Sequence, residues 1–153
     1  MQLTLTLRFK LDASRDQKQK LLETAKAYAD GVNFVLSENL KNKTTKVKKL
    51  HRLYYSSIRK AFSLPAQLVI NVYRDVAAIY KTLWAQYKEL KRRKPDSKAA
   101  KKFWEEPPKR RSLIAKYTHN RTISFKFAGA DEIYVSISTL QGCLSDPQLR
   151  PLF

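Results

Sequence analysis

The sequence predicts an α+β protein in which a small antiparallel sheet or β-barrel carries an inserted bundle of three helices. Residues 3–11, LTLTLRFKL, alternate apolar and polar positions as a half-buried strand does. Between residues 14 and 92, apolar residues recur at the three- and four-residue spacing of amphipathic helices. Strand-like alternation returns after residue 121. A lone N-terminal strand cannot bury its face, so we expect it to pair with the C-terminal strands.

The first strand and the first helix have clear local signals. Leu3, Leu5, Leu7, Phe9 and Leu11 fall on one face of the predicted strand. The following DASRDQ predicts a capping box, in which Ser14 accepts from the backbone three residues on and Gln17 reaches back. The helix that begins there is expected to end near KNKTT, at about residue 40.

Two further helices and a pair of strands follow. A second helix is predicted over residues 47–62, and a third from Pro65, which suits a first turn, to about Arg92. Residues 94–111 form a basic linker that contains Pro95, Pro107 and Pro108. The stretches RTISFKFAG and DEIYVSISTL then predict strands, the second alternating at Ile133, Val135 and Ile137.

The charge indicates a polyanionic partner. The 153 residues hold 31 Lys and Arg against 13 Asp and Glu, a formal net charge of +18. A small domain needs only a few units of charge to stay in solution. No acidic residue lies between Glu38 and Asp75, whereas that interval is rich in lysine and arginine. A solvated surface is the alternative interpretation of such runs, but surfaces that serve solubility mix both signs.

Several classes of protein are excluded by composition. No apolar run approaches the roughly 20 residues of a spanning helix, and no secretory signal precedes the first strand. Cys143 cannot form an internal disulfide, and with only His51 and His119 besides it cannot complete a zinc site. The three glycines are too far apart for a phosphate loop. We therefore expect a cytoplasmic protein without metal, cofactor, small-molecule substrate or membrane partner.

One face of the third helix has the residue types that read base edges. Gln67, Asn71 and Arg74 are spaced by four and three residues, so they should share a line on the helix surface. Gln and Asn can pair with adenine, and Arg with guanine or a phosphate. An ordinary solvated polar face is the alternative.

Further candidates for contact with nucleic acid lie on the second helix and around the linker. The cations expected on phosphates are Lys46, Lys49, Arg52, Arg59, Lys60, Lys109, Arg110, Arg111, Lys116 and Arg121. Tyr117 and Asn120 lie within the last basic segment and complete the set.

In the order of its segments the chain resembles the N-terminal half of the TnpB (OrfB) proteins, transposon-encoded RNA-guided DNA nucleases related to type V CRISPR effectors. The resemblance spans about residues 3–142. Its matching segments are LTLRFKLDASRDQKQKLLETAKAYADGVNFVL, LHRLYYSSIRKAFSLPAQLVINVYRDVAAIYKTL, and KRRSLIAKYTHNRTISFKF with IYVSISTLQG.

The resemblance implies a wedge-like β domain formed by residues 1–12 and 112–145, a helical recognition lobe over residues 13–93, and the basic linker 94–111. It implies guide RNA and double-stranded DNA as partners, and a role for Gln67 in reading the motif that flanks the target. Transposon-encoded proteins of this kind would be nucleoid-associated in a prokaryote when bound to DNA.

The chain departs from that family in stopping at Phe153, before the RuvC-like nuclease domain. Two-metal cleavage needs carboxylates that converge on a pair of ions about 4 Å apart, and Asp75, Asp131 and Glu132 do not provide such a set. We therefore expect no catalytic residues in this chain, with a separate nuclease chain as a further candidate partner. The alternative function is a stand-alone, non-enzymatic RNA- or DNA-binding protein or regulator derived from such a protein. A membrane-surface protein fits poorly, because the basic residues are not paired with an exposed face of leucine and aromatic residues.

Overall fold

The computed structural model describes residues 8–128, 132–145 and 147–151, and its fold is α+β as predicted. The first strand is seen as β1 (Phe9–Asp12), whereas Leu3, Leu5 and Leu7 lie outside the described residues. Three long helices follow: α1 (Arg15–Glu38), α2 (Val47–Phe62) and α3 (Ala66–Arg93). After the short helix α4 (Lys98–Lys102), the chain enters β2 (Ile123–Phe127), β3 (Ile133–Thr139), β4 (Gly142–Leu144) and β5 (Gln148–Pro151).

The helix ends follow the local chemistry of the sequence. The predicted capping box of α1 is confirmed: Ser14 Oγ accepts from the Gln17 backbone at 3.2 Å, and the Gln17 side chain accepts from the Ser14 backbone at 2.9 Å. α2 ends where Ser63 adopts a left-handed backbone conformation, which reverses the chain into α3. Pro65 directly precedes α3, where its missing N–H costs no helical hydrogen bond.

The sheet is antiparallel and is organised around β3. On one side β3 pairs with β2, from Ile123 opposite Ile137 to Phe127 opposite Ile133. On the other side the two ends of β3 pair with β4 and β5, and β5 in turn pairs with β1. The N-terminal strand therefore joins the C-terminal strands, as expected, through β5.

The expected β-barrel is not formed by the described residues. β1 and β2 are the two ends of an open sheet and do not pair with each other. Closing a barrel requires strands long enough to tilt and stagger around a common axis. Here β1 has four residues and β4 three, which is too short for that geometry, and α1 covers part of one face instead.

The main apolar core lies among α1, α2 and α3, away from the sheet. Tyr28, Val32 and Leu36 of α1 are fully buried, as are Val69, Val72 and Val76 of α3. From α2 the core receives Leu50, Tyr54 and Ile58 at helical spacing. The sheet joins this body through α1, because Leu140 at the end of β3 donates its N–H to Thr24 Oγ1 at 3.1 Å.

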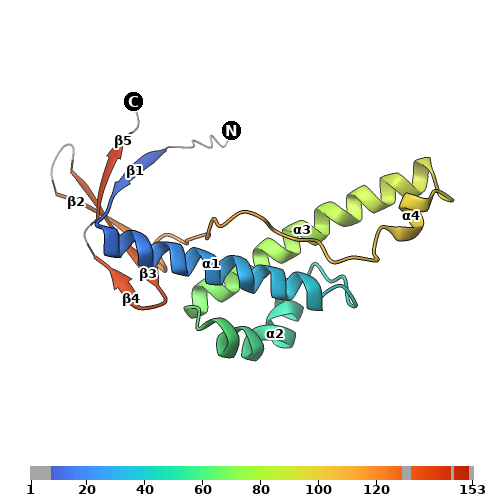
Figure 1. Ribbon diagram of the computed structural model, residues 1–153, viewed down its shortest axis with the longest axis horizontal. Helices are drawn as coiled ribbons and strands as arrows, with labels where there is room; N and C mark the ends of the chain where they lie inside the picture. Colours follow the sequence, from blue (N-terminus) through green and yellow to red (C-terminus); the bar gives the residue numbers. More distant parts are fainter. Residues whose placement is uncertain (1–7, 129–131, 146, 152–153) are drawn as a thin grey trace.

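The C-terminal half of α3 and helix α4 extend to the end of the molecule opposite the sheet (Figure 1). This end holds a group of aromatic side chains that continues from the core. There Trp84 and Tyr87 of α3 contact Trp104, which follows α4. From this end, residues 103–118 return along the helices to β2 (Figure 1). The segment predicted as a linker over residues 94–111 therefore contains a helix and packs against α3.

Candidate nucleic-acid interface

The basic residues of α2 lie on its exposed side. Lys48, Lys49, Arg52, Arg59 and Lys60 are exposed, whereas the apolar stripe of the helix is buried. Lys46, at the N-cap position, lies beside Lys48, Lys49 and Arg52, and these four residues line a shallow hollow. Within the described residues, none of these cations forms a salt bridge with a carboxylate. Their charge is therefore left to solvent or to a ligand.

The positions of these lysines oppose the dipole of α2. The N-terminal end of a helix carries partial positive charge, which favours acidic residues and disfavours cations. α2 nevertheless has Lys46 at its N-cap, Lys48 and Lys49 in its first turn, and no acidic residue there. It also lacks a side-chain hydrogen bond at the N-cap. The start of α2 thus has basic residues where helix stability favours acidic ones.

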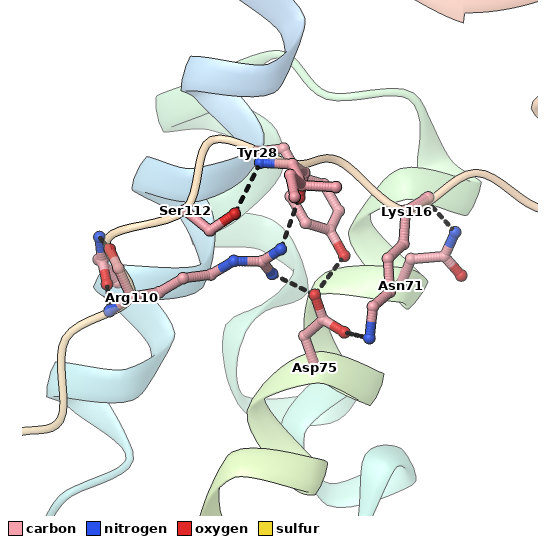
Figure 2. A network of polar contacts seen from close by, with 8 residues as sticks. Tyr28, Asn71, Asp75, Arg110, Ser112 and Lys116 are labelled. Carbon is pink, nitrogen blue, oxygen red and sulfur yellow. Dashed lines mark hydrogen bonds and ion pairs between the residues drawn. The ribbon is translucent and has the colours of Figure 1, made fainter. Parts of the chain in front are cut away.

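The one acidic residue between Glu38 and Glu89 does not compensate this surface, because it is internal. Asp75 is 4% exposed, and its carboxylate forms ion pairs with Arg110 and Lys116 and accepts a 3.0 Å hydrogen bond from the Tyr28 hydroxyl. Figure 2 shows these three partners converging on Asp75 from α1 and from the returning chain. Burial and the neighbouring Asp75 raise the pKa of Tyr28 well above its usual value, so the hydroxyl remains a donor.

Two asparagines attach the returning chain to the helices. We call residues 109–118 the strap. Asn33 of α1 donates to the Arg110 carbonyl at 3.1 Å and accepts from its N–H at 2.7 Å. Asn71 of α3 donates to the Lys116 carbonyl at 2.7 Å and to Thr118 Oγ1 at 3.1 Å. Together with Asp75 they hold the strap across α1 and α3.

These contacts correct two predictions about individual residues. Asn71 was expected on an open face with Gln67 and Arg74, but it is 4% exposed and its amide binds the strap. Arg110 was expected on a phosphate, but its guanidinium lies against Asp75 and also donates to the Ile114 carbonyl at 2.5 Å. Both errors have one physical cause: the buried side of α3 also packs against a strap distant in sequence, and buried polar groups need partners.

The other two residues of the predicted line do reach the surface. Arg74 is exposed and contacts Asn71 Oδ1 at 3.5 Å, beside a hollow that also includes Lys116 and Tyr117. Gln67 is half-buried, and its Oε1 lies 3.5 Å from Arg121 Nη1. α3 and the segment before β2 therefore form one continuous surface.

The remaining candidates fall in different surroundings. Arg59 donates to the Leu64 carbonyl and so also closes the turn between α2 and α3. Lys109 and Arg111 are exposed on the strap, on either side of the internal Arg110. Tyr117 is half-buried, and burial raises the pKa of its hydroxyl. Asn120 takes a left-handed conformation in the turn before β2, with φ of 57°.

Comparison with protein-family models, with curated proteins and with solved structures found no match to this chain.

Two structural features bear on other classes of site. Among the described residues no helix is long and apolar enough to span a membrane. In the same part of the chain, no three His, Cys, Asp or Glu side chains gather in a way that would hold a metal ion.

The list of candidates from sequence did not include some residues that the structure brings to this surface. Lys48 lies in the same hollow as Lys46 and Lys49, and it was signalled by the same basic run. Lys116, in contrast, was one of the cations expected on phosphates; it lies beside Arg74, and its side chain is 62% exposed although its amine contacts Asp75. The pairing of Asn33 with Arg110 had no local signal, because the two residues are 77 positions apart.

Proposed function

We propose that this chain binds nucleic acid through the basic face of α2 and the adjoining surface formed by α3 and the segment before β2. The observation that carries the proposal is the uncompensated charge of α2. Residues 39–88 contain a single acidic residue, Asp75, and its carboxylate is already paired with Arg110 and Lys116. Lysines occupy the positive end of the helix dipole, where they cost stability. A phosphate backbone supplies the counter-charge that the protein lacks.

More specifically, we propose that the chain is the part of a transposon-associated, RNA-guided DNA endonuclease that binds the guide RNA and the target-flanking DNA. The support is the resemblance to TnpB proteins together with the order strand, three helices, basic segment, strands. On this proposal the sheet corresponds to the wedge-like part, and α1, α2 and α3 form the inserted recognition lobe. Cleavage would belong to a nuclease domain or a separate chain. A stand-alone binding protein derived from such an enzyme is the alternative.

Salt dependence tests the general proposal. If about six phosphates are neutralised, the affinity for RNA or duplex DNA should fall roughly a thousandfold between 50 and 200 mM salt. In gel-shift titrations, the double variant Lys49→Gln/Arg52→Gln should bind more weakly, with a salt slope reduced by about two. The matched control is Lys18→Gln/Lys26→Gln on α1, which removes the same charge from exposed positions elsewhere. Affinity that does not respond to salt would contradict the proposal.

The RNA that copurifies with the protein separates the specific proposal from its alternative. A guide-binding protein should enrich one structured RNA species over the cellular pool, whereas a general binding protein should carry a mixture that follows abundance. Sequencing of RNA recovered from wild type and from the Lys49→Gln/Arg52→Gln variant measures that enrichment. Recovery of the same mixture with both proteins would count against a guide-binding function.

A further inference from the structure

We infer that a polar hollow on the uncovered face of the sheet is a binding site for a phosphate group of a nucleic-acid strand. This inference rests on the proposed function and adds to its interface a site on the sheet. The hollow measures about 250 Å³ and lies between the turn before β2 and strands β3 and β4. Its lining includes Arg121, Asn120, Ser124, Ser136, Ser138 and Cys143, and it contains no carboxylate.

Strand register explains why these side chains gather. Ser124 lies opposite Ser136, and Ser138 lies opposite Cys143. Directly opposed residues in an antiparallel pair point to the same face, and so do residues two apart on one strand. The four side chains therefore share one face of the sheet. They are all small, which leaves a hollow where longer side chains would fill the surface.

The two faces of β3 have opposite characters. Val135, Ile137 and Thr139 alternate with the serines and are buried. Their side of the sheet faces the body that contains α1. The serines are only half-buried, because no element of the described chain covers their side. Around the hollow this face thus exposes small hydroxyl groups, whereas further along the same face Lys126 lies opposite Tyr134.

The chemistry of the lining suits a phosphate group. A guanidinium and hydroxyl groups are the donors that proteins commonly direct at phosphate oxygens. The hollow is several times the ~30 Å³ share of one water molecule in the liquid, so a phosphate group can enter. Arg121 lies at the rim, where its long 3.5 Å contact with Gln67 Oε1 leaves its other N–H groups for a ligand.

The same contact places the hollow beside the candidate interface on α3. A strand that passes Gln67 at the start of α3 would reach Arg121 next and then the serines. The site therefore extends the proposed interface from the helices onto the sheet. The shared chemistry is a phosphate group, supplied either by a nucleic-acid strand or by the free ion.

Cys143 supplies a reporter inside the hollow, because it is exposed and is the single cysteine of the chain. Its Sγ lies 2.8 Å from Ser136 Oγ. The rate of its alkylation by iodoacetamide is measured by mass spectrometry, with and without a random-sequence RNA oligonucleotide. In a parallel arm, inorganic phosphate replaces chloride at constant ionic strength. A gel shift with the same RNA records binding independently.

If the site binds a strand phosphate, RNA should slow alkylation several-fold. Arg121→Gln should weaken RNA binding about tenfold and reduce the protection. Ser138→Val, which fills the hollow without removing charge, should act in the same direction. Lys88→Gln removes one positive charge from an exposed position on the distant half of α3 and should leave the protection unchanged.

The RNA and phosphate experiments distinguish a strand phosphate from the free ion, and they test this site independently of the proposed function. Protection by RNA alone supports a strand phosphodiester, and protection by inorganic phosphate as well shows that the free ion also binds. RNA binding in the gel shift without any protection of Cys143 would overturn this site and leave the proposed function standing. Protection by inorganic phosphate without RNA binding would retain the anion site and reject the proposed function. Undiminished protection and affinity in Ser138→Val would also overturn the site.

Discussion

Asp75 is the residue on which the attachment of the strap depends most. Its carboxylate accepts a hydrogen bond from the Tyr28 hydroxyl of α1 and forms ion pairs with Arg110 and Lys116 of the strap. The protein as a whole has a large excess of positive charge. A buried carboxylate is costly unless its partners are in place, and buried cations are equally costly without it. Arg110 is the more enclosed partner, at 13% side-chain exposure, whereas Lys116 is largely exposed. The pair with Arg110 should therefore contribute more than the pair with Lys116.

Replacing this carboxylate tests the assignment. Asp75→Asn keeps the shape of the side chain but leaves Arg110 without a counter-charge, so the free energy of unfolding should fall by about 3 kcal/mol. Lys116→Gln should cost less than about 1 kcal/mol, because that side chain is exposed. Urea denaturation followed by circular dichroism measures both. Asp96→Asn, at an exposed turn, is the matched control and should be neutral. Equal effects of Asp75→Asn and Asp96→Asn would show that the network is unimportant.

Gln67, like Arg74, is a residue of the predicted line that stays available to a ligand. If it reads base edges, Gln67→Ala should lose preference at one or two base pairs by about 1–3 kcal/mol. Lys49→Ala should instead weaken binding to every sequence alike, because a phosphate contact has no sequence information. Selection from a randomised duplex, with the copurified RNA present, measures the preference. Identical base preferences in wild type and Gln67→Ala would show that Gln67 does not read base edges.

The buried tyrosines make stability depend on alkaline pH. Burial raises the pKa of Tyr80 from 10.0 to about 12, and its hydroxyl donates to the Leu36 carbonyl at 2.8 Å. Burial also raises the pKa of Tyr73. The folded state holds these protons more tightly than the unfolded state, so the associated stability is complete below about pH 10 and is lost as the pH rises toward 12.

Unfolding midpoints in urea across that interval measure the loss. Tyr80→Phe removes one titrating group, so its stability should decline less steeply with pH than that of wild type. Overlapping pH profiles for the two proteins would contradict the assignment.

At the scale of single elements, α1 has a well-formed N-terminus and α2 does not. The capping box of α1 satisfies backbone N–H groups at both Ser14 and Gln17. Ser14→Ala should therefore lower the free energy of unfolding by about 1 kcal/mol. Ser37→Ala, at an exposed position in the last turn of the same helix, should change it little. Thermal unfolding of the two variants measures the difference, and equal melting temperatures would rule out a contribution from the cap.

The start of α2 yields a prediction in which stability and binding change in opposite directions. Lys48→Glu places an acidic residue in the first turn, where it should stabilise the helix by about 0.3–1 kcal/mol. The same change should weaken RNA or DNA binding, because it removes one cation from the basic hollow and adds a negative charge. Thermal unfolding and gel shifts on one preparation measure both effects. A variant that gains stability and keeps full affinity would remove α2 from the interface.

At the scale of the whole molecule, the acidic residues in the described part of the chain are not gathered as two-metal cleavage requires. Asp75 is paired with Arg110 and Lys116, and no group of three potential metal ligands gathers within the described ranges. We therefore predict that the purified chain with magnesium leaves plasmid DNA intact, with or without its copurified RNA. An agarose-gel assay checks this prediction. Cleavage that persists through repurification and is abolished by replacing Asp131 and Glu132 would contradict it.

The sequence by itself determined the elements whose signals are local. α1, α2 and α3 begin and end within a few residues of their predicted bounds, because caps, proline and apolar spacing act over one or two turns. β2 and β3 were predicted from their alternation. The exposure of Lys46, Lys49, Arg52, Arg59 and Lys60 also followed from the sequence, since the apolar stripe of α2 leaves its cations on the opposite side.

Only the tertiary structure decided which polar residues form hydrogen bonds and ion pairs inside the protein. Asn71 and Arg110 have the side chains of nucleic-acid contacts, but their partners lie 45 and 35 positions away in sequence, on the strap and on α3. β4 and β5 have only three and four residues, too few for a clear alternation, and they pair with edges offered by β3 and β1. The hollow beside Arg121 likewise depends on strand register, which places serines from two strands on one face. Local patterns define what an element is, whereas burial of a polar side chain depends on segments that meet only when the chain folds.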